Sequence, residues 1–311
     1  MSESHQYKLA VIILNYKTAN LVVDCLDSID KEKLNHDFCV VVVDNDSNDG
    51  STDFIQQAIE SRNWGAWAEL IESGVNGGFS FGNNLGMSHV SAQSYLLLNS
   101  DTLLTAGAIK GLIEFSDKNP EVGIISPDLI WPDGQYQTSS FVDVSPVYEL
   151  IRSSQLGFIR RILNRFNVPL KHSDKVSYPD WVCFACVLIK RDVIRYVGGL
   201  DEKYFMYFED VDYCKRSRQA GFMIANYPES KVIHFNGGSS GINNKKQPIR
   251  ELPDYYYRSR TRYFKEHFGR RGLFVANVLW SIGRLIYFIR QIFSRKSVNV
   301  QNDVFLKIWG F

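Results

Sequence analysis

The stretch Phe38-Cys-Val-Val-Val-Val43 runs directly into Asp44-Asn-Asp-Ser-Asn-Asp-Gly50. A second run of the same kind, Tyr95-Leu-Leu-Leu98, ends in Asn99-Ser-Asp101. Short apolar runs rich in β-formers are typical of strands that are buried on both faces of a parallel sheet. Ligands of such sheets bind just beyond the carboxyl ends of the strands. Because both runs end in acids, we expect a ligand that is cationic or rich in hydrogen-bond donors.

The elements around these two strands alternate along the first half of the chain. Strands are expected at residues 9–14, 38–43, 69–72, 95–98 and 122–126, and helices at 18–28, 51–60, 80–90 and 106–117. The helix at 51–60 is expected to begin with a Ser/Thr cap. Such alternation predicts an α/β fold in which helices flank a mostly parallel sheet.

The pattern changes after residue 126. Residues 141–177 carry basic clusters among apolar residues and have no strand pattern, which indicates a mobile or surface insertion. Further along the chain, we expect one long buried strand at 181–189, a helix at 211–220 and a strand at 222–227.

Length and composition favour a globular protein. With 311 residues, 45% of them hydrophobic, the chain has ample material for a core and is not disordered. The net charge of +1 conceals an asymmetry, because residues 245–311 carry 14 Lys/Arg and 4 Asp/Glu, which leaves residues 1–244 at −9. A nucleic-acid partner is disfavoured, since it would need a basic patch on this acidic body.

The cysteines and the amino terminus predict a reduced, cytoplasmic protein. The five cysteines are an odd number, and the first residues lack the charged and apolar regions of a signal peptide. Cys183 and Cys186 form a lone CxxC inside the strand expected at 181–189, where alternation places their side chains on opposite faces. Two buried thiols explain this pair better than a redox or zinc site does.

Residues 272–293 form the most apolar stretch of the basic tail. Arg284 and Arg290 interrupt it, and each charge costs about 2.5–3.5 kcal/mol at the centre of a membrane helix on insertion scales. The pattern therefore indicates a basic amphipathic helix that lies on an anionic membrane surface rather than a span. A helix packed on the protein core is the alternative.

A glycine-rich segment, Asn76-Gly-Gly-Phe-Ser-Phe-Gly-Asn-Asn-Leu-Gly86, follows the third strand and opens a helix. Its backbone can approach a ligand closely, and its N–H groups can face an anion. Turn glycines without a ligand explain such a segment equally well.

Two further features have the chemistry of a catalytic site. Asp101, at the end of its strand, is a candidate ligand for Mg²⁺ or Mn²⁺, with His234 as a second ligand. A turn acid and a structural histidine are the alternatives. Glu209 and Asp210 follow several aromatic residues and precede a helix. They are either a general base in an aromatic, sugar-sized pocket or the acids of a well-capped helix.

Taken in order, these motifs resemble glycosyltransferase family 2, and among its members the bacterial rhamnosyltransferases that build cell-surface polysaccharides. The resemblance spans about residues 8–265. The motifs are Val11-Ile-Ile-Leu-Asn-Tyr16, Val-Val-Asp44-Asn-Asp-Ser47, the glycine-rich segment, Leu-Asn99-Ser-Asp101, Phe205-Met-Tyr-Phe-Glu-Asp-Val-Asp212 and His234. The resemblance implies a GT-A fold that binds a nucleotide-diphosphate sugar and transfers the sugar with inversion. We accordingly expect a GT-A domain at 1–245, with a variable insertion at 141–177, and a basic helical extension at 246–311.

The resemblance also implies roles for single residues. Asp44 would contact the nucleobase, and Asp46 would lie in the nucleotide-binding loop. Asp210 would be the catalytic base, while Glu209 would position the acceptor or orient Asp210.

The implied metal is Mn²⁺ or Mg²⁺. Asp101 matches the final acid of the family's DXD-type motif, and His234 matches a histidine that can complete the metal shell. Here the motif reads Asn99-Ser-Asp101, so an amide replaces its first acid. The other residues expected at the nucleotide sugar are Asn15, Asn76, Gly77, Gly78, Phe79, Asn83, Asn84, Asn99, Ser100 and Arg258, with Trp181 and Tyr207 at the acceptor or sugar pocket.

Arg258 and Arg262 lie four residues apart in the tail, on one face of a helix. This spacing predicts a clamp for the diphosphate. A basic face directed at anionic lipid is equally compatible with it.

The narrowest interpretation is a rhamnosyltransferase that uses dTDP-L-rhamnose and a lipid-linked saccharide acceptor at the inner face of the cell membrane. Members with nearly the same motifs use UDP-linked galactofuranose, glucose or N-acetylhexosamines, so these donors stay open, as does a homodimer. Other classes are a catalytically silent sugar-binding subunit and a nucleotidyltransferase. The latter would need a glycine-rich loop with a basic residue near the amino terminus, which Leu14-Asn-Tyr-Lys17 does not provide.

Overall fold

The structure is a computed structural model that describes residues 6–34, 37–235, 252–293 and 302–311. Within these residues the main sheet has eight strands in the order β3-β2-β1-β4-β9-β6-β10-β5. They are β1 (Tyr7–Asn15), β2 (Phe38–Asp44), β3 (Ala68–Glu72), β4 (Ala92–Asn99), β5 (Thr102–Leu104), β6 (Val122–Ile130), β9 (Cys186–Lys190) and β10 (Met223–His234).

The first half of the sheet is parallel, as its apolar runs predict. β1 pairs in parallel with both β2 and β4, and β2 pairs in parallel with β3. The register places Asn15 opposite Asp44 and Leu14 opposite Asn99, so the strand ends meet at one edge.

Helices cover both faces of this sheet, which confirms the expected α/β class. They are α1 (Ala19–Asp30), α2 (Ser51–Ser61), α3 (Gly78–His89), α4 (Ala108–Lys118), α7 (Arg191–Val197) and α8 (Glu209–Gln219). The Ser/Thr cap expected for α2 is wrong, because Gly50 at φ 83° precedes the helix without a capping side chain, while the Ser51 hydroxyl donates to Asp49.

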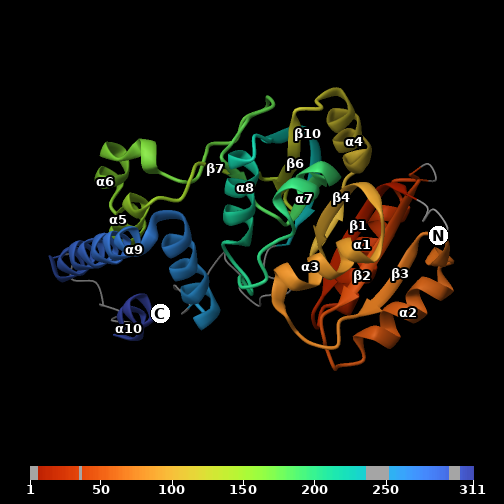
Figure 1. Cartoon of the computed structure of the whole chain (residues 1–311), viewed down its shortest axis with the longest axis horizontal. Helices are drawn as coiled ribbons and strands as arrows, with labels where there is room; N and C mark the ends of the chain where they lie inside the picture. The colour runs from red at the N-terminus through yellow and green to blue at the C-terminus, as the bar shows by residue number, and fades with distance from the viewer. Residues whose placement is uncertain (1–5, 35–36, 236–251, 294–301) are drawn as a thin grey trace.

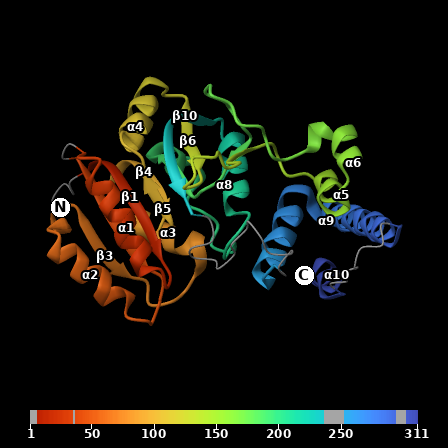
Figure 2. The ribbon, with the colours of Figure 1, turned by 180° about the vertical axis from the view of Figure 1, so that it is seen from behind.

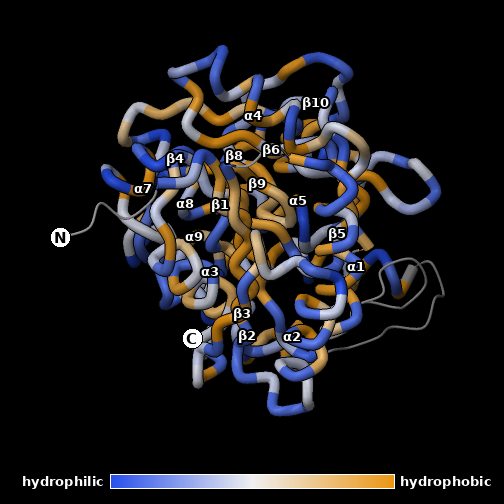
Figure 3. Tube along the Cα trace, turned by 90° about the vertical axis from the view of Figure 1, so that its right-hand side faces the viewer, coloured by the Kyte–Doolittle hydropathy of each residue, from blue (hydrophilic) through white to orange (hydrophobic). Residues whose placement is uncertain are grey.

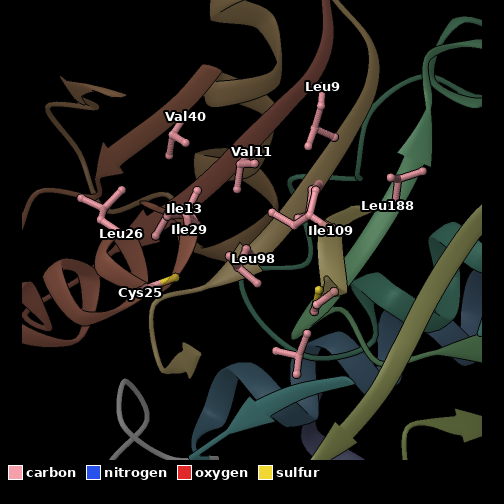
Figure 4. Packing of buried hydrophobic residues seen from close by; sticks show 14 of the residues in the cluster. Leu9, Val11, Ile13, Cys25, Leu26, Ile29, Val40, Leu98, Ile109 and Leu188 are labelled. Atoms are coloured by element: carbon pink, nitrogen blue, oxygen red, sulfur yellow. The ribbon is translucent and has the colours of Figure 1, made fainter. Parts of the chain in front are cut away.

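The core is split by the sheet into two layers. Side chains of β1 alternate between them: Leu9, Val11 and Ile13 belong to one layer, and Ala10 and Ile12 to the other. Figure 4 shows the first layer, in which Leu26 and Ile29 of α1 approach the β1 side chains. Hydrophobic residues concentrate along the central strands in Figure 3, while hydrophilic residues dominate the periphery. Burial on both faces is what distinguishes these strands from half-exposed ones.

The single strand expected at 181–189 is wrong. The chain turns at residues 183–185, which separate β8 (Trp181–Val182) from β9. β8 pairs with β7 (Ser140–Phe141) in a small second sheet, where the Trp181 ring stacks on Phe141 with centroids 3.9 Å apart. β9 enters the main sheet antiparallel to β4 and β6. An apolar run alone could not reveal this break, because both halves are equally apolar.

Residues 141–177, expected as a mobile or surface insertion, hold regular structure. They contain α5 (Pro146–Ser154), α6 (Gly157–Ile162) and a short 3-10 turn. α5 packs tightly on the long helix α9 (Asp254–Phe293). Gly283 makes this approach possible, since a Cβ there would lie 2.0 Å from Ser153 Oγ and 2.9 Å from the Leu150 carbonyl oxygen.

α5, α6, α9 and α10 (Asn302–Gly310) form a helical part beside the α/β part (Figure 1). The view from behind in Figure 2 has the same division, with the amino terminus at the opposite end of the molecule. α9 is broken at Gly269, where φ is 69° and ψ is −179°. Among the described residues, one helix, Asp254–Ile292, is long and apolar enough to cross a membrane by length and composition. The expected domain boundary at 245/246 lies outside the described residues.

Candidate active site

A cavity of about 530 Å³ opens at the carboxyl ends of the parallel strands. Ten of the residues that the sequence assigns to a site line it: Asn76, Gly78, Phe79, Asn99, Ser100, Asp101, Tyr207, Glu209, Asp210 and His234. These residues come from four stretches of the chain that are far apart in the sequence. The fold therefore gathers the strand-end motif, the glycine-rich segment, the acid pair and the histidine around one space.

Asp101 and His234 lie side by side because of a short antiparallel ladder. β10 pairs with β5 so that His234 lies opposite Thr102, the residue after Asp101. His234 Nε2 is 3.5 Å from Asp101 Oδ1, and both residues are buried. The end of the last strand thus completes a site that begins at the end of β4.

Gln137 fixes the imidazole of His234. Its Nε2 donates to the His234 carbonyl oxygen at 2.6 Å, and its Oε1 lies 3.1 Å from His234 Nδ1. Because a carbonyl oxygen can only accept, Nδ1 carries the proton in the neutral ring, and Nε2 presents its lone pair toward Asp101. Two acceptor atoms 3.5 Å apart repel unless a cation or a proton lies between them.

This pair fits the expected divalent metal. Oxygen and imidazole ligands suit Mn²⁺, and both Mn²⁺ and Mg²⁺ keep water or phosphate oxygens as further ligands. Over the part of the chain that is described, no three His, Cys, Asp or Glu side chains come together as a metal-binding group. Asp101 and His234 would therefore hold the ion together with ligands from the substrate and solvent.

The acid pair is presented by a strained turn. Tyr207 and Phe208 both have positive φ angles, 69° and 68°, immediately before α8 begins at Glu209. For bulky residues this left-handed conformation costs about 1–2 kcal/mol each. Strain of this kind persists only where the surrounding packing enforces it, here through Phe208 in an aromatic cluster with Tyr263. The turn directs Glu209 and Asp210 into the cavity.

Burial changes the acidity of both carboxyl groups. It raises the pKa of Asp210 to about 7, against a partial opposing effect from the Val211 N–H, which donates to Asp210 Oδ1 at 2.8 Å. Burial also raises the pKa of Glu209 well above its ordinary value, and the neighbouring Asp210 charge adds to this effect. Asp210 is thus poised to take a proton near neutral pH, and Glu209 holds its proton to a higher pH than an ordinary glutamate does.

Asp44 and Asp46 lie in a separate place. They line a small cavity of about 70 Å³ beyond β2. The buried Asp44 carboxylate accepts from Asn15 Nδ2 at 2.6 Å and from Ser47 Oγ at 2.6 Å. Asp46 adopts φ 61° and accepts from Asn48. The acids that follow β2 and β4 therefore lie at two different sites. The Asp44 carboxylate is held by hydrogen bonds, whereas Asp101 lies beside His234.

The glycine-rich segment serves close packing. A Cβ on Gly78, which has φ 85°, would lie 2.2 Å from the Phe205 carbonyl oxygen. Phe79 N–H donates to that same oxygen at 2.7 Å, while Gly77 N–H donates to Val75 and Gly78 N–H to Asn76. The expectation that this backbone faces an anion is wrong at these three N–H groups, because protein acceptors occupy them. The contact instead joins α3 to the turn that carries the acid pair.

Two asparagines of the same segment bind to protein. Asn83 Nδ2 donates to the Phe79 carbonyl within α3. Asn84 forms two hydrogen bonds with the backbone of Leu200. Its side chain donates to the Leu200 carbonyl at 2.8 Å and accepts from the Leu200 N–H at 2.9 Å. Neither residue lines the cavity.

Arg258, Arg262 and Trp181 also lie outside the cavity lining. Arg258 is exposed, with its guanidinium 5.2 Å from the centre of the Phe311 ring. Arg262 forms ion pairs with Asp201 and Glu266, so its guanidinium is engaged within the protein. Their expected part in a diphosphate clamp stays a prediction.

Sequence reasoning missed several cavity residues. Tyr16 follows β1, Asn45 follows β2, and Phe205 and Tyr255 supply aromatic walls. The Tyr255 ring packs against Tyr207 with centroids 5.9 Å apart, so α9 contributes directly to the cavity. Tyr16 and Phe205 stand within motifs that were recognised, whereas Tyr255 has no local signal.

The CxxC pair contains free thiols. Cys183 is half-buried and lines the cavity, and burial raises its pKa to about 12. Cys186 is fully buried in β9, where burial raises its pKa as well. Both sulfurs are therefore protonated at neutral pH, which favours the interpretation as structural thiols.

The mixed sheet, its flanking helices and the cavity at the strand ends fit the GT-A fold. The sequence matches the model of glycosyl transferase family 2 over residues 10–194, and the chain belongs to this family. Both the fold and the family confirm the resemblance seen in the motifs.

Among the curated relatives are bacterial rhamnosyltransferases. The N-acetylglucosaminyl-diphospho-decaprenol L-rhamnosyltransferase of Mycobacterium tuberculosis is 25% identical over 218 residues, which cover 65% of this chain and 68% of that protein. The dTDP-rhamnosyl transferase RfbF of Shigella flexneri is 25% identical over 232 residues, which cover 72% of this chain and 69% of that protein.

Solved structures share the fold. The mannosyltransferase PcManGT of Pyrobaculum calidifontis, in complex with GDP-Man and Mn²⁺, has a TM-score of 0.57 at 14% identity, covering 98% of this chain and 80% of its own. GalNAc-T7 with UDP, GalNAc and Mn²⁺ has a TM-score of 0.62 at 13% identity, and the match covers 97% of this chain and 54% of the GalNAc-T7 chain. The family establishes a glycosyltransferase, and these neighbours establish its fold.

Proposed function

We propose that the protein is an inverting glycosyltransferase that transfers L-rhamnose from dTDP-L-rhamnose to a lipid-linked or polysaccharide acceptor. The observation that carries this proposal is that Asp210, a half-buried carboxyl group whose pKa is raised to about 7, lines the same cavity as the Asp101–His234 pair. One end of the cavity can thus take a proton while the other can hold a charged diphosphate.

The reaction is a displacement at the anomeric carbon. The acceptor hydroxyl oxygen forms a bond to that carbon, and its proton passes to the Asp210 carboxylate. The bond from the anomeric carbon to the diphosphate oxygen breaks, and the electron pair leaves with the diphosphate. Attack on the face opposite the leaving group inverts the configuration, through an oxocarbenium-like transition state.

Glu209 lines the same cavity beside Asp210 and would support this step. Its Oε2 is buried and makes no hydrogen bond among the described residues. Burial raises its pKa well above the ordinary value, and in its protonated form Glu209 can donate to an acceptor oxygen or to Asp210 without adding a second negative charge.

Asp101 and His234 would hold Mn²⁺ or Mg²⁺. When bound, such an ion neutralises charge on the departing diphosphate. Manganese in the two structural neighbours supports a divalent ion here as well. Gln137 keeps the His234 Nε2 lone pair available for it.

Asp44, Asp46 and Asn15 would form the nucleoside end of the donor site. Their loop lies directly beyond β2; Asp44 and Asp46 line the smaller cavity, while Asn45 between them lines the main one. Tyr207, which lines the cavity, would lie toward the sugar or acceptor.

The named relatives support rhamnose as the donor sugar and a lipid diphosphate as the acceptor anchor. A lipid-linked acceptor would place the enzyme at the inner face of the cell membrane, as a peripheral protein. UDP-linked sugars are the alternative donors within the same family.

A donor panel tests the proposal. Thermal unfolding and donor hydrolysis are measured with dTDP-, UDP- and GDP-sugars, each with and without Mn²⁺. We expect dTDP-L-rhamnose to raise the melting temperature most, and only with metal present. A preference for a UDP-sugar would overturn the rhamnose assignment, and stabilisation by no donor would overturn the enzyme assignment.

A further inference from the structure

The helical part of the molecule exposes large apolar side chains on three elements. Phe158 and Ile162 of α6 are 71% and 64% exposed. The second section of α9 and the end of α10 continue this exposure, with Phe274, Val275, Ile282, Leu285, Phe288, Ile289, Ile292, Phe305, Leu306, Trp309 and Phe311. Exposed apolar groups that are clustered mark an interaction site.

On α9 these side chains follow one stripe. Val275, Ile282, Leu285, Ile289 and Ile292 recur at spacings of three, four and seven residues, which places them on one helix face. The opposite face of α9 is covered by protein. Gly283 meets α5, and Trp280 is buried with Ile308 of α10. A helix with one face covered by its own protein and one apolar face open to solvent lies along a surface rather than crossing a bilayer.

The charged residues of α6 and of the second section of α9 are all basic. From residue 150 to 173 the sequence has no Asp or Glu but contains Arg152, Arg160, Arg161, Arg165 and Lys171. From residue 267 to 302 it again has no Asp or Glu but contains Arg270, Arg271, Arg284, Arg290, Arg295 and Lys296. The packing of α5 on α9 brings together the described parts of these two acid-free segments, whose first residues lie more than a hundred positions apart.

We propose that α6, the second section of α9 and α10 form one docking face for an anionic lipid bilayer. The apolar side chains would enter the interface, and the arginines would meet the lipid phosphates. Arg160, Arg161, Arg270 and Arg271 are exposed and suit this contact. α6 then has a function that its position in the insertion did not reveal, since it gives the enzyme a second membrane contact beside the tail.

A bilayer fits this face better than a second copy of the chain. A two-fold pair would bring both sets of arginines together with no carboxylate in either segment to neutralise them. Like charges at such an interface cost free energy, whereas anionic headgroups gain it.

α9 also connects this face to the cavity. Its first section begins beside the cavity at Tyr255 and ends at Gly269, where the docking face begins. Fourteen residues of α-helix span about 21 Å. The cavity is therefore within reach of a short saccharide on a membrane-anchored diphosphate. Only this statement about the saccharide acceptor rests on the proposed function; the docking face itself does not.

Vesicle binding tests the docking face. The full chain is sedimented with vesicles of phosphatidylcholine alone or with added phosphatidylglycerol, at low and high salt. We expect binding to the anionic vesicles that weakens with salt. The double variant Phe158→Ser with Ile162→Ser should bind at least about tenfold more weakly, since each side chain loses an apolar contact with the bilayer. Arg160→Glu with Arg161→Glu should also bind at least about tenfold more weakly.

Matched controls lie on the α/β part. Phe54 and Tyr196 are 47% and 79% exposed, and Phe54→Ser with Tyr196→Ser should bind like wild type. Arg195, whose side chain is 70% exposed, provides Arg195→Glu as the charge control. All variants are first compared with wild type by thermal unfolding and by the shift that the donor produces.

Three results would overturn the inference. They are no binding of wild type to anionic vesicles, equal losses in the α6 variants and the controls, or a dimer in solution that the α6 variants dissociate. The last result would assign the face to a second copy. The donor-induced thermal shift is independent of this face, so a failed vesicle test with an intact shift rejects docking and leaves the transfer proposal standing.

Discussion

Gln137 holds His234 at two points, by donating to its carbonyl oxygen at 2.6 Å and by accepting from Nδ1 at 3.1 Å. The same histidine turns Nε2 toward Asp101 Oδ1, 3.5 Å away. A residue outside every recognised motif thus sets the orientation and tautomer of a candidate metal ligand. Outer-shell partners of this kind affect metal affinity about as strongly as some ligands do.

Gln137→Met should weaken the binding of Mn²⁺ by about 10–100-fold, because the imidazole loses its fixed orientation. Titration calorimetry in the presence of dTDP measures this directly. Gln135→Met, two residues earlier and exposed, is the control and should leave the affinity unchanged. Equal affinities for wild type and the Gln137 variant would mean that Gln137 serves only the fold.

Gly78→Ala should destabilise the protein by at least about 2 kcal/mol. Its Cβ would collide with the Phe205 carbonyl oxygen at 2.2 Å, in addition to the strain of φ 85°. Gly74 has φ 70° but open space around it, so Gly74→Ala isolates the strain alone, at about 1–2 kcal/mol. Chemical denaturation compares the two variants. If their losses are equal, the contact between α3 and the acid-bearing turn is not tight.

Arg260→Met should cost about 3–5 kcal/mol of stability. Arg260 is fully buried and lies 3.1 Å from Glu149 of α5, so its removal leaves a buried carboxylate with a poorer partner. Arg258→Met, on the same helix and exposed, should change stability by less than about 0.5 kcal/mol. In the double variant Arg260→Met with Glu149→Leu, the loss should be smaller than the sum of the single losses. Additive losses would contradict a direct pairing.

The parallel half of the sheet was accessible from the sequence because its signals are local. Apolar runs such as 38–43 and 95–98 are buried on both faces, and the polar residues that end them meet at one edge through parallel register. Asp101 was recognisable for that reason. The element boundaries also agree with the structure to within a few residues for α1, α2 and β2.

The remaining features depend on contacts between distant residues. Gln137 reaches His234 across 97 residues, and Arg260 meets Glu149 of an insertion that has no strand pattern. The break at residues 183–185 is set by the pairing of β8 with β7, which the apolar run does not encode. The role expected for Arg258 followed from its spacing to Arg262, and that of Asn84 from the resemblance of the glycine-rich segment, whereas their side chains contact Phe311 and Leu200.

Asp210 should also affect stability as a function of pH. The folded chain holds its proton up to about pH 7, whereas the ordinary value for an unfolded chain is 3.8. Ionisation is therefore more favourable in the unfolded state, and the folded state loses relative stability as the pH rises from 3.8 to about 7. Asp210→Asn should raise the melting temperature relative to wild type, by an amount that grows over this range and is constant above it. A constant difference at all pH values would contradict the raised pKa.

The pH dependence of single-turnover transfer, measured for wild type and Asp210→Asn with donor and metal in excess, tests the central claim most directly. For wild type, the rate should rise tenfold per pH unit below about pH 7 and then level off, as the Asp210 carboxylate forms. Asp210→Asn should lie about 10²–10⁴-fold below that plateau while keeping the donor-induced thermal shift, and the exposed control Asp192→Asn should match wild type. Transfer by Asp210→Asn at the wild-type rate, with the same pH profile, would contradict the assignment of Asp210 as the base.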